Sequence, residues 1–295
     1  MIEVYEKYQE EVKQAMRAYL AQNQSGDVTL SKAMHYTLEN LGKSLRPVLC
    51  LGFCEAFVGD REKAMPFALA LEMVHSYSLI HDDLPCMDDD DFRRGRASCH
   101  KAFDEATAVL TGDALLTEAF VLMTQAKLSG ERVVEGISAL GEASGKLGMI
   151  SGQAKELSYE KSEKSLSPTE EERLILDIEM EKTGALFAAS AYLGALAAGA
   201  DFKEKEKLFR FGRALGSAFQ IQDDLLDALG DKEKLGKPIG SDAEKAKRNY
   251  YTVFGEESAK KQMELQTKEA LEILNSYENT EFLSWLVNYL CHREF

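Results

Sequence analysis

Proline, cysteine and tryptophan are scarce in this chain. Its 295 residues include 5 prolines, 5 cysteines and 1 tryptophan, whereas Leu, Ala, Glu and Lys dominate. Runs of β-branched residues, which favour strands, are also rare. Because proline interrupts helices and the abundant residues are good helix formers, this composition favours an all-α protein.

The cysteines are odd in number and lack the spacing of a zinc site. Cys50 and Cys54 lie four residues apart in an apolar stretch, so we expect core thiols. This usage is typical of a reducing compartment, and we expect a cytoplasmic protein. No signal peptide is visible after Met1, and no apolar run approaches membrane-spanning length, so we expect no membrane insertion.

Basic residues are outnumbered, since 35 Lys and Arg against 50 Asp and Glu give a net charge of −15. A chain of this charge repels nucleic acid and anionic membrane surfaces, so neither is an expected partner. An anionic substrate would therefore need a local group of cations or a metal ion.

Apolar residues recur at helical spacing along most of the chain. No linker or internal repeat divides it, so we expect one domain, 1–295, built as a bundle of about ten or more helices around a central cavity. Ser167 and Glu170 form a capping box around Pro168, which predicts a helix start there. The expected helices cover residues 2–20, 28–41, 46–58, 63–83, 101–128, 131–156, 168–199, 203–229, 243–275 and 279–291.

A cluster of six carboxylates, the first aspartate cluster, lies within 82–91 and comprises Asp82, Asp83 and Asp88 to Asp91. Carboxylate oxygens suit Mg²⁺, and the arginines after them suit phosphate, so the segment predicts a diphosphate held through metal ions. The alternative is a solvated acidic loop. Because Pro85 interrupts helical structure, we expect the helix to stop near Asp83 and Asp88 to return to the metal through a turn.

A second aspartate cluster, Asp223, Asp224 and Asp227, lies inside an apolar helical pattern. Helical spacing places Asp223 and Asp227 on one face, with Gln220 one turn earlier. Buried carboxylates are costly unless they are paired or bound to metal. If these carboxylates bind metal, the two aspartate clusters can face each other across a cavity. The alternative interpretation is a polar rim on an amphipathic helix.

Basic residues at three other places favour an anion. Lys43 and Arg46 flank a helix entry, where the helix macrodipole disfavours positive charge unless an anion is shared. His75 precedes Asp82 by two helical turns and points to nearly the same face. Lys182 lies in an apolar helix, where it either snorkels to water or reaches a diphosphate together with Thr183.

These motifs resemble those of the bacterial short-chain trans-prenyl diphosphate synthases, most closely the farnesyl diphosphate synthase type. The resemblance spans about residues 38 to 250, in the same order as in the family. It rests on segments 42–47, 72–88, 93–95, 99–103, 111–116, 182–184, 220–227 and 236–242.

The resemblance implies a Mg²⁺-dependent condensation of isopentenyl diphosphate with dimethylallyl or geranyl diphosphate that gives farnesyl diphosphate. It implies a homodimer and, with substrate bound, three Mg²⁺ ions held by Asp82, Asp88, Asp223 and Asp227, with Asp83 in support. The residues that it implies for the allylic diphosphate are Arg93, Lys182, Thr183, Gln220, Lys237 and Lys247. Those that it implies for the isopentenyl diphosphate are Lys43, Arg46, His75 and Arg94.

Tyr77 precedes Asp82 by five residues, about 7.5 Å along a helix. It resembles the aromatic residue that limits product length in the family; the alternative is an ordinary core tyrosine. The chain departs from the family pattern at four places. They are Ser44, where arginine is usual, Glu156, where aspartate is common, Glu179, where histidine is frequent, and residues 249–251, Asn-Tyr-Tyr, where Thr-Tyr-Pro is more usual.

Several alternatives stay open. The product can instead be geranyl or geranylgeranyl diphosphate, and the chain can instead be a non-catalytic partner subunit of a prenyltransferase, although such subunits typically lack one aspartate cluster. Terpene cyclases usually carry a different second metal motif, and squalene or phytoene synthases lack the isopentenyl site. A Ca²⁺-binding protein is disfavoured because no EF-hand loop is present.

Overall fold

The computed structural model describes residues 1–24, 26–162, 164–229 and 248–292, and nearly all of its regular structure is helical. The expected all-α fold is confirmed. The chain separates into two compact units, the first formed by Met1–Ser138 with Leu193–Ala200 and the second by Ala139–Tyr192 with Asp201–Phe295. Whether residues 1–295 act as one domain stays a prediction.

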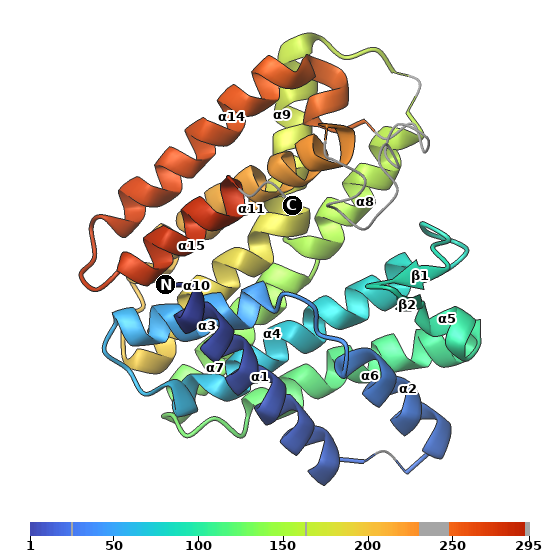
Figure 1. Ribbon diagram of the computed structural model, residues 1–295, viewed down its shortest axis with the longest axis vertical. Coiled ribbons are helices and arrows are strands. Elements are labelled where there is room, and N and C mark those ends of the chain that lie inside the picture. The colour runs from blue at the N-terminus through green and yellow to red at the C-terminus, as the bar shows by residue number, and fades with distance from the viewer. Residues whose placement is uncertain (25, 163, 230–247, 293–295) are drawn as a thin grey trace. The chain divides into compact units, whose positions relative to one another are not determined.

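The first unit contains most of the N-terminal elements. They are α1 (Ile2–Gln22), α2 (Val28–Leu38), α3 (Leu45–Ala56), α4 (Arg61–Asp82), β1 (Phe92–Arg93), β2 (Arg96–Ala97), α5 (Cys99–Ala102) and α6 (Glu105–Met123). In Figure 1, α4 and α6 lie side by side, and α3 also packs on α4. Phe53 of α3 and Phe67 of α4 are completely buried in this core, as are the thiols of Cys50 and Cys54.

Two helices, α7 (Gly130–Ser144) and α10 (Ala185–Ala198), contain the boundaries between the units. The second unit contains α8 (Met149–Glu160), α9 (Pro168–Glu179), a π-helical turn η1 (Met180–Gly184), α11 (Glu204–Leu229), α14 (Tyr250–Leu274) and α15 (Glu281–Cys291). A side chain on Gly212 would lie 2.1 Å from the backbone of Ala188, and one on Gly216 would lie 2.3 Å from Gly184 Cα. The small residues of 184–200 therefore permit close helix packing.

Short polar residues explain where several helices begin. Asp27, Asp60 and Asp104 each accept a hydrogen bond from a backbone N–H in the first turn of the following helix. The capping box of Ser167 and Glu170 at the start of α9 is present, which confirms that prediction. The single helix expected over 168–199 is instead α9, η1 and α10, because a π-helical turn interrupts it.

The structure contains a small hairpin that the helical pattern did not predict. Phe92 pairs with Ala97, and Arg93 pairs with Arg96, in an antiparallel register. Arg94 and Gly95 have positive φ values of 52° and 74°, which form the tight turn between the strands.

One helix of the described residues, α6, is long and apolar enough to span a membrane, with a mean hydropathy of 1.4 over 18 residues. Asp113 and Glu118 interrupt its apolar sequence, so α6 contains no uninterrupted apolar run of that length. Core helices of soluble proteins pass the same test, and α6 packs along α4.

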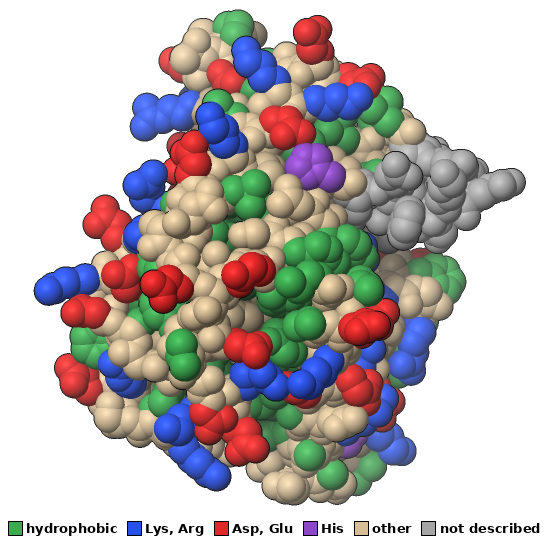
Figure 2. All heavy atoms as spheres, turned by 60° about the vertical axis from the view of Figure 1, so that its left-hand side comes forward, with side chains coloured by type: hydrophobic (Ala, Val, Ile, Leu, Met, Phe, Trp, Pro, Cys, Tyr) green, Lys and Arg blue, Asp and Glu red, His purple; other side chains and the backbone are tan. Residues whose placement is uncertain are grey.

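On the face drawn in Figure 2, acidic and basic side chains are interspersed.

Candidate functional site

The first aspartate cluster begins at the end of α4. The helix stops at Asp82 with Asp83 as its C-cap, which confirms the expected end point. The chain then turns back, and the Asp88 amide donates to the Asp82 carbonyl over 2.8 Å. Asp82 and Asp88 are half-buried, whereas Asp83 is 2% exposed. The turn therefore returns Asp88 to the helix end, and Asp82 and Asp88 each keep part of their surface exposed.

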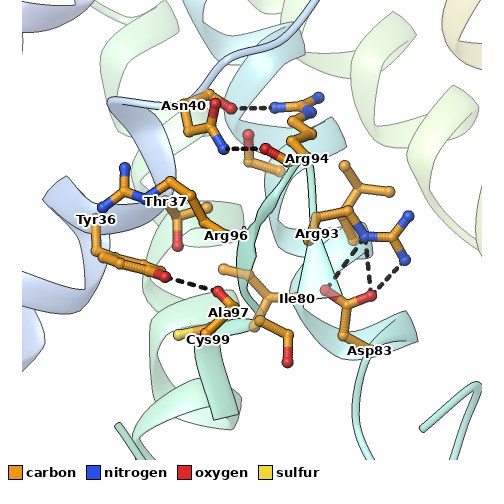
Figure 3. Close-up of a pocket in the computed structure, with 13 residues that line it drawn as sticks. Tyr36, Thr37, Asn40, Ile80, Asp83, Arg93, Arg94, Arg96, Ala97 and Cys99 are labelled. Carbon is orange, nitrogen blue, oxygen red and sulfur yellow. Dashed lines mark hydrogen bonds and ion pairs between the residues drawn. The ribbon is translucent and has the colours of Figure 1, made fainter. Parts of the chain in front are cut away.

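Asp83 is occupied by an arginine of the hairpin. Arg93 Nε donates to Asp83 Oδ1 over 2.9 Å, and Arg93 Nη2 donates to the same oxygen (Figure 3). Burial alone lowers the pKa of Arg93, but the hydrogen bonds and charge of Asp83 outweigh it and raise that pKa. Asp83 thus holds Arg93 beside the helix end, which fits a supporting role.

Arg94 is held from two directions. Its Nη1 donates to the Asn40 carbonyl over 2.6 Å, and Asn40 Nδ2 donates back to the Arg94 carbonyl over 3.4 Å (Figure 3). Its Nη2 lies 3.9 Å from Oε1 of Glu72, which is 1% exposed. A Cβ on Gly42 would lie 2.7 Å from Arg94 Nε, so a side chain there would displace the guanidinium.

The surroundings of Arg94 form a cationic group with one buried acid. Burial raises the pKa of Glu72 to about 7, although Arg94 and Arg46 oppose the shift. Burial, followed by the charges of Arg46, Arg94 and Arg93, lowers the pKa of His75 well below its usual value. Burial also lowers the pKa of Arg46 to about 10, still above neutral pH. His75 is therefore a neutral hydrogen-bonding group beside charged arginines, which suits binding of an anion.

Lys43 precedes α3 in a strained loop. It is exposed, and it lies between Gly42 and Ser44, whose φ values are +61° and +46°. Ser44, at a position where the family usually has arginine, is 3% exposed, and no hydrogen bond of its Oγ is found among the described residues. The loop therefore presents Lys43 to solvent and directs Ser44 into the protein.

The second aspartate cluster lies on α11 in the second unit. Asp223 and Asp227 are half-buried, whereas Asp224 is 5% exposed and accepts a hydrogen bond from Gln220 Nε2 over 3.0 Å. Thr183 Oγ1 donates to Gln220 Oε1 over 3.2 Å. Gln220 thus links Thr183 of η1 to Asp224. Asp223 and Asp227 are the more exposed residues of the second aspartate cluster.

Lys182 lies in the π-helical turn and not in a regular helix. Such turns widen the backbone and are frequent at functional sites. The Nζ of Lys182 donates a hydrogen bond to Glu156 of α8. A Cβ on Gly152 of α8 would lie 2.3 Å from the backbone nitrogen of Lys182, so the two segments pack closely. The departure at Glu156 therefore supplies the partner of Lys182.

The departure at Glu179 fills a buried position. Glu179 is 5% exposed, and its Oε2 accepts a hydrogen bond from Ser217 Oγ over 2.7 Å. Burial raises the pKa of its carboxyl to about 8, against the effect of Ser217. Near neutral pH, therefore, the carboxyl retains its proton.

Tyr77 lies in the core of the first unit with 5% of its surface exposed. Its ring meets the His81 ring edge-on, with centroids 5.7 Å apart. The Val109 carbonyl of α6 lies 3.2 Å from His81 Nε2. No hydrogen bond of the Tyr77 hydroxyl is found in the described part of the chain. Tyr77 is therefore held by packing rather than by its hydroxyl.

The sequence did not predict one further group. Within the described residues, Asp89, Asp91 and His100 each offer a ligand atom within 4.8 Å of the other two, which is a possible cation site. Lys101 Nζ lies 2.9 Å from Asp91 Oδ1 and already offsets part of this negative charge. The nearby acidic run and His100 were the available signals, but only the hairpin brings them together.

Two predicted residues, Lys237 and Lys247, lie outside the described residues. The others form two groups, one in each unit. The first unit holds Asp82, Asp83, Asp88, Arg93, Arg94, Lys43, Arg46, His75 and Tyr77, and the second holds Lys182, Thr183, Gln220, Asp223 and Asp227.

The fold and these groups define an all-helical protein whose accessible carboxylates and clustered arginines suit a metal-bound diphosphate. The family model described as polyprenyl synthetase matches residues 27–290. The chain belongs to this family and is a prenyltransferase.

Individual relatives agree with that assignment. The chain is 40% identical over 294 residues to a farnesyl diphosphate synthase of Geobacillus stearothermophilus, which covers 97% of this chain and 95% of the relative. It is 40% identical over 268 residues to geranylgeranyl pyrophosphate synthase 4 of Arabidopsis thaliana, covering 90% of this chain and 71% of the relative. The apo structure of an FPP/GFPP synthase from Zymomonas mobilis matches with a TM-score of 0.85 and 34% identity, covering 99% of this chain and 100% of that chain.

Proposed function

We propose that this prenyltransferase condenses isopentenyl diphosphate with dimethylallyl and then geranyl diphosphate, and that it releases farnesyl diphosphate. The observation that carries the proposal is the end of α4, where Asp82 and Asp88 stay accessible while Asp83 holds Arg93. Accessible carboxylates beside a positioned guanidinium suit a diphosphate and its metal counter-ions.

The donor set fits Mg²⁺, because Asp82, Asp88, Asp223 and Asp227 offer only hard carboxylate oxygens. Magnesium bound by these residues would stabilise the charge that develops on the leaving diphosphate. The number of ions expected with substrate bound is three.

The allylic diphosphate is assigned to one set of cations and hydrogen-bonding groups. Arg93 is already oriented by Asp83, and Lys182 by Glu156, so each needs little rearrangement to meet an anion. The complete proposed set is Arg93, Lys182, Thr183, Gln220, Lys237 and Lys247. These side chains stabilise the departing diphosphate as the allylic carbon becomes a cation.

The isopentenyl diphosphate is assigned to Lys43, Arg46, His75 and Arg94. The low pKa of His75 keeps its ring neutral, so it donates one hydrogen bond without adding charge to the arginines. The bound alkene attacks the allylic cation and forms the new carbon–carbon bond, and a proton is then lost to the departed diphosphate. No strong protein base is needed for this step.

Tyr77 supports the farnesyl product, because its buried ring lies on the same helix as Asp82, five residues earlier. Geranyl and geranylgeranyl diphosphate are the alternative products, since the relatives carry both farnesyl and geranylgeranyl names. A non-catalytic partner subunit is the alternative of another class.

We also propose that the protein is a cytoplasmic homodimer without membrane insertion. Helix α6 supports a protein interface, because Leu110 is 59% exposed and Val121 46% exposed on a strongly apolar helix. Size-exclusion chromatography with light scattering should give twice the monomer mass of 32.9 kDa. A Leu110→Asp variant should elute as a monomer; a wild-type monomer contradicts the dimer.

The assay that tests the function combines labelled isopentenyl diphosphate with dimethylallyl, geranyl or farnesyl diphosphate, with and without Mg²⁺. We expect incorporation with the first two primers, abolished by a chelator and restored by Mg²⁺. Asp82→Asn and Asp223→Asn should each lower the rate at least about 100-fold, as loss of transition-state charge stabilisation does. Equal rates for these variants and wild type would contradict the proposed site.

A further inference from the structure

Helix α1 contacts the loop that carries Lys43, here called the Lys43 loop (40–44). Tyr5 Oη donates a hydrogen bond of 2.7 Å to the Lys43 carbonyl, and Gln9 Nε2 donates one of 2.8 Å to the same oxygen. Gln9 Nε2 also lies 3.1 Å from Tyr5 Oη. Tyr5 and Gln9 are four residues apart and so lie on one face of α1. Two side chains of one helix therefore converge on a single main-chain oxygen.

The Lys43 loop needs such support. Ser44 has a left-handed backbone with a φ of +46°, which costs about 1 kcal/mol or more for a residue with a side chain. Strained backbone persists only where surrounding contacts determine it. The Ser44 hydroxyl is buried, and no hydrogen bond from it is found among the described residues. The hydrogen bonds that Tyr5 and Gln9 donate to the Lys43 carbonyl, in contrast, act on the peptide group next to Ser44 and can support its strained backbone.

The position of this carbonyl also determines how the next helix starts. Helix α3 begins at Leu45, and the Val48 amide bonds to the Ser44 carbonyl over 3.1 Å. Fixing the peptide that joins Lys43 to Ser44 therefore fixes both the root of the Lys43 side chain and the first turn of α3, which carries Arg46. Both cations belong to the proposed isopentenyl diphosphate site.

We propose that Tyr5 and Gln9 are positioning residues of the isopentenyl diphosphate site, acting through the Lys43 carbonyl. This inference rests on the proposed function. Neither residue belongs to the side chains assigned to isopentenyl diphosphate, and the allylic site is likewise assigned to other residues. Their loss should therefore weaken the use of isopentenyl diphosphate and leave the use of the allylic diphosphate unchanged.

The chain offers a matched control on the same helix. Tyr19 is 8% exposed, compared with 5% for Tyr5, and its hydroxyl donates to Glu118 of α6. Tyr5→Phe and Tyr19→Phe each delete a part-buried hydrogen bond that a tyrosine hydroxyl of α1 donates to another segment, but only the Tyr5 bond ends on the Lys43 loop; Tyr5→Phe also removes the acceptor of the Gln9 amide. A merely structural role of α1 would affect both variants alike.

The experiment measures KM for each substrate, kcat and the thermal midpoint of Tyr5→Phe, Gln9→Met, their double variant and Tyr19→Phe. Loss of the hydrogen bond from Tyr5 to the Lys43 carbonyl should raise the KM for isopentenyl diphosphate between about twofold and tenfold in Tyr5→Phe, and further in the double variant. The KM for geranyl diphosphate and kcat should stay within about twofold. Tyr19→Phe should leave both KM values unchanged.

Calorimetric titration with isopentenyl diphosphate gives the same comparison without turnover. Equal affinity in Tyr5→Phe and Tyr19→Phe, or an equal rise of both KM values in Tyr5→Phe, would overturn the inference while the wild type stays active. A wild-type chain that transfers no prenyl group contradicts the proposed function instead. The two failures are therefore distinguishable.

Discussion

Replacing Tyr77 with alanine tests whether this side chain limits the product. Tyr77 is 5% exposed, and its ring packs edge-on against His81, 5.7 Å between centroids. Removing a buried aromatic side chain should cost about 3–5 kcal/mol of unfolding free energy, because it leaves a cavity. A typical domain has a free energy of unfolding of about 5–15 kcal/mol, so the variant should still fold at 25 °C. The vacated volume lies about 7.5 Å along the helix from Asp82 and should admit a longer hydrocarbon chain.

The control for this variant keeps the ring. Burial and Asp82 raise the pKa of the Tyr77 phenol to about 12, so it is uncharged, and its hydroxyl finds no hydrogen bond in the described part of the chain. Tyr77→Phe should therefore retain both the stability and the product of the wild type.

Product lengths are measured by chromatography of the dephosphorylated prenols, with isopentenyl diphosphate in excess, and stability by urea unfolding. Tyr77→Ala should shift the main product to a longer chain and lower the unfolding midpoint. The reasoning fails if folded Tyr77→Ala gives the same product distribution as Tyr77→Phe.

Two further predictions concern stability. Gly112→Ala should lower the free energy of unfolding by about 1–3 kcal/mol, because its Cβ would lie 2.2 Å from His81 Nε2. Gly130→Ala, whose Cβ would meet no atom within 4 Å, should raise it by about 0.4–1 kcal/mol. Both values are measured by urea unfolding, and equal effects of the two variants would contradict the packing around Gly112. Burial raises the pKa of Glu179 from 4.5 to about 8, so between these pH values the folded chain keeps a proton that the unfolded chain loses. The stability that comes from this proton is therefore complete below pH 4.5 and declines as the pH rises to about 8. Glu179→Gln, which still accepts from Ser217, should flatten the pH dependence of the urea midpoint between pH 5 and 8; an unchanged slope would refute it.

Local sequence rules predicted the parts of the site that depend on neighbouring residues. Pro85 placed the end of α4 near Asp83, and the apolar pattern placed Asp223 on a helix. Ser167 and Glu170 placed the start of α9. In each case the determining residues lie within a few positions of the feature.

Contacts between distant segments were not predictable in this way. Lys182 pairs with Glu156, 26 residues earlier, and Tyr5 reaches the Lys43 carbonyl across 38 residues. Helical periodicity says which face is buried but does not say which partner a polar side chain meets. The π-helical turn at Lys182 also escaped prediction, because no proline lies within Met180–Gly184 to mark a change of the helix.

This chain alone should join isopentenyl and allylic diphosphates. The most direct measurement is mass spectrometry of the product that the purified chain forms from isopentenyl and dimethylallyl diphosphate with Mg²⁺, with no second protein added. Farnesyl diphosphate as the main product is the predicted result. No prenyl product from any allylic primer would contradict the proposed activity and favour a non-catalytic partner subunit.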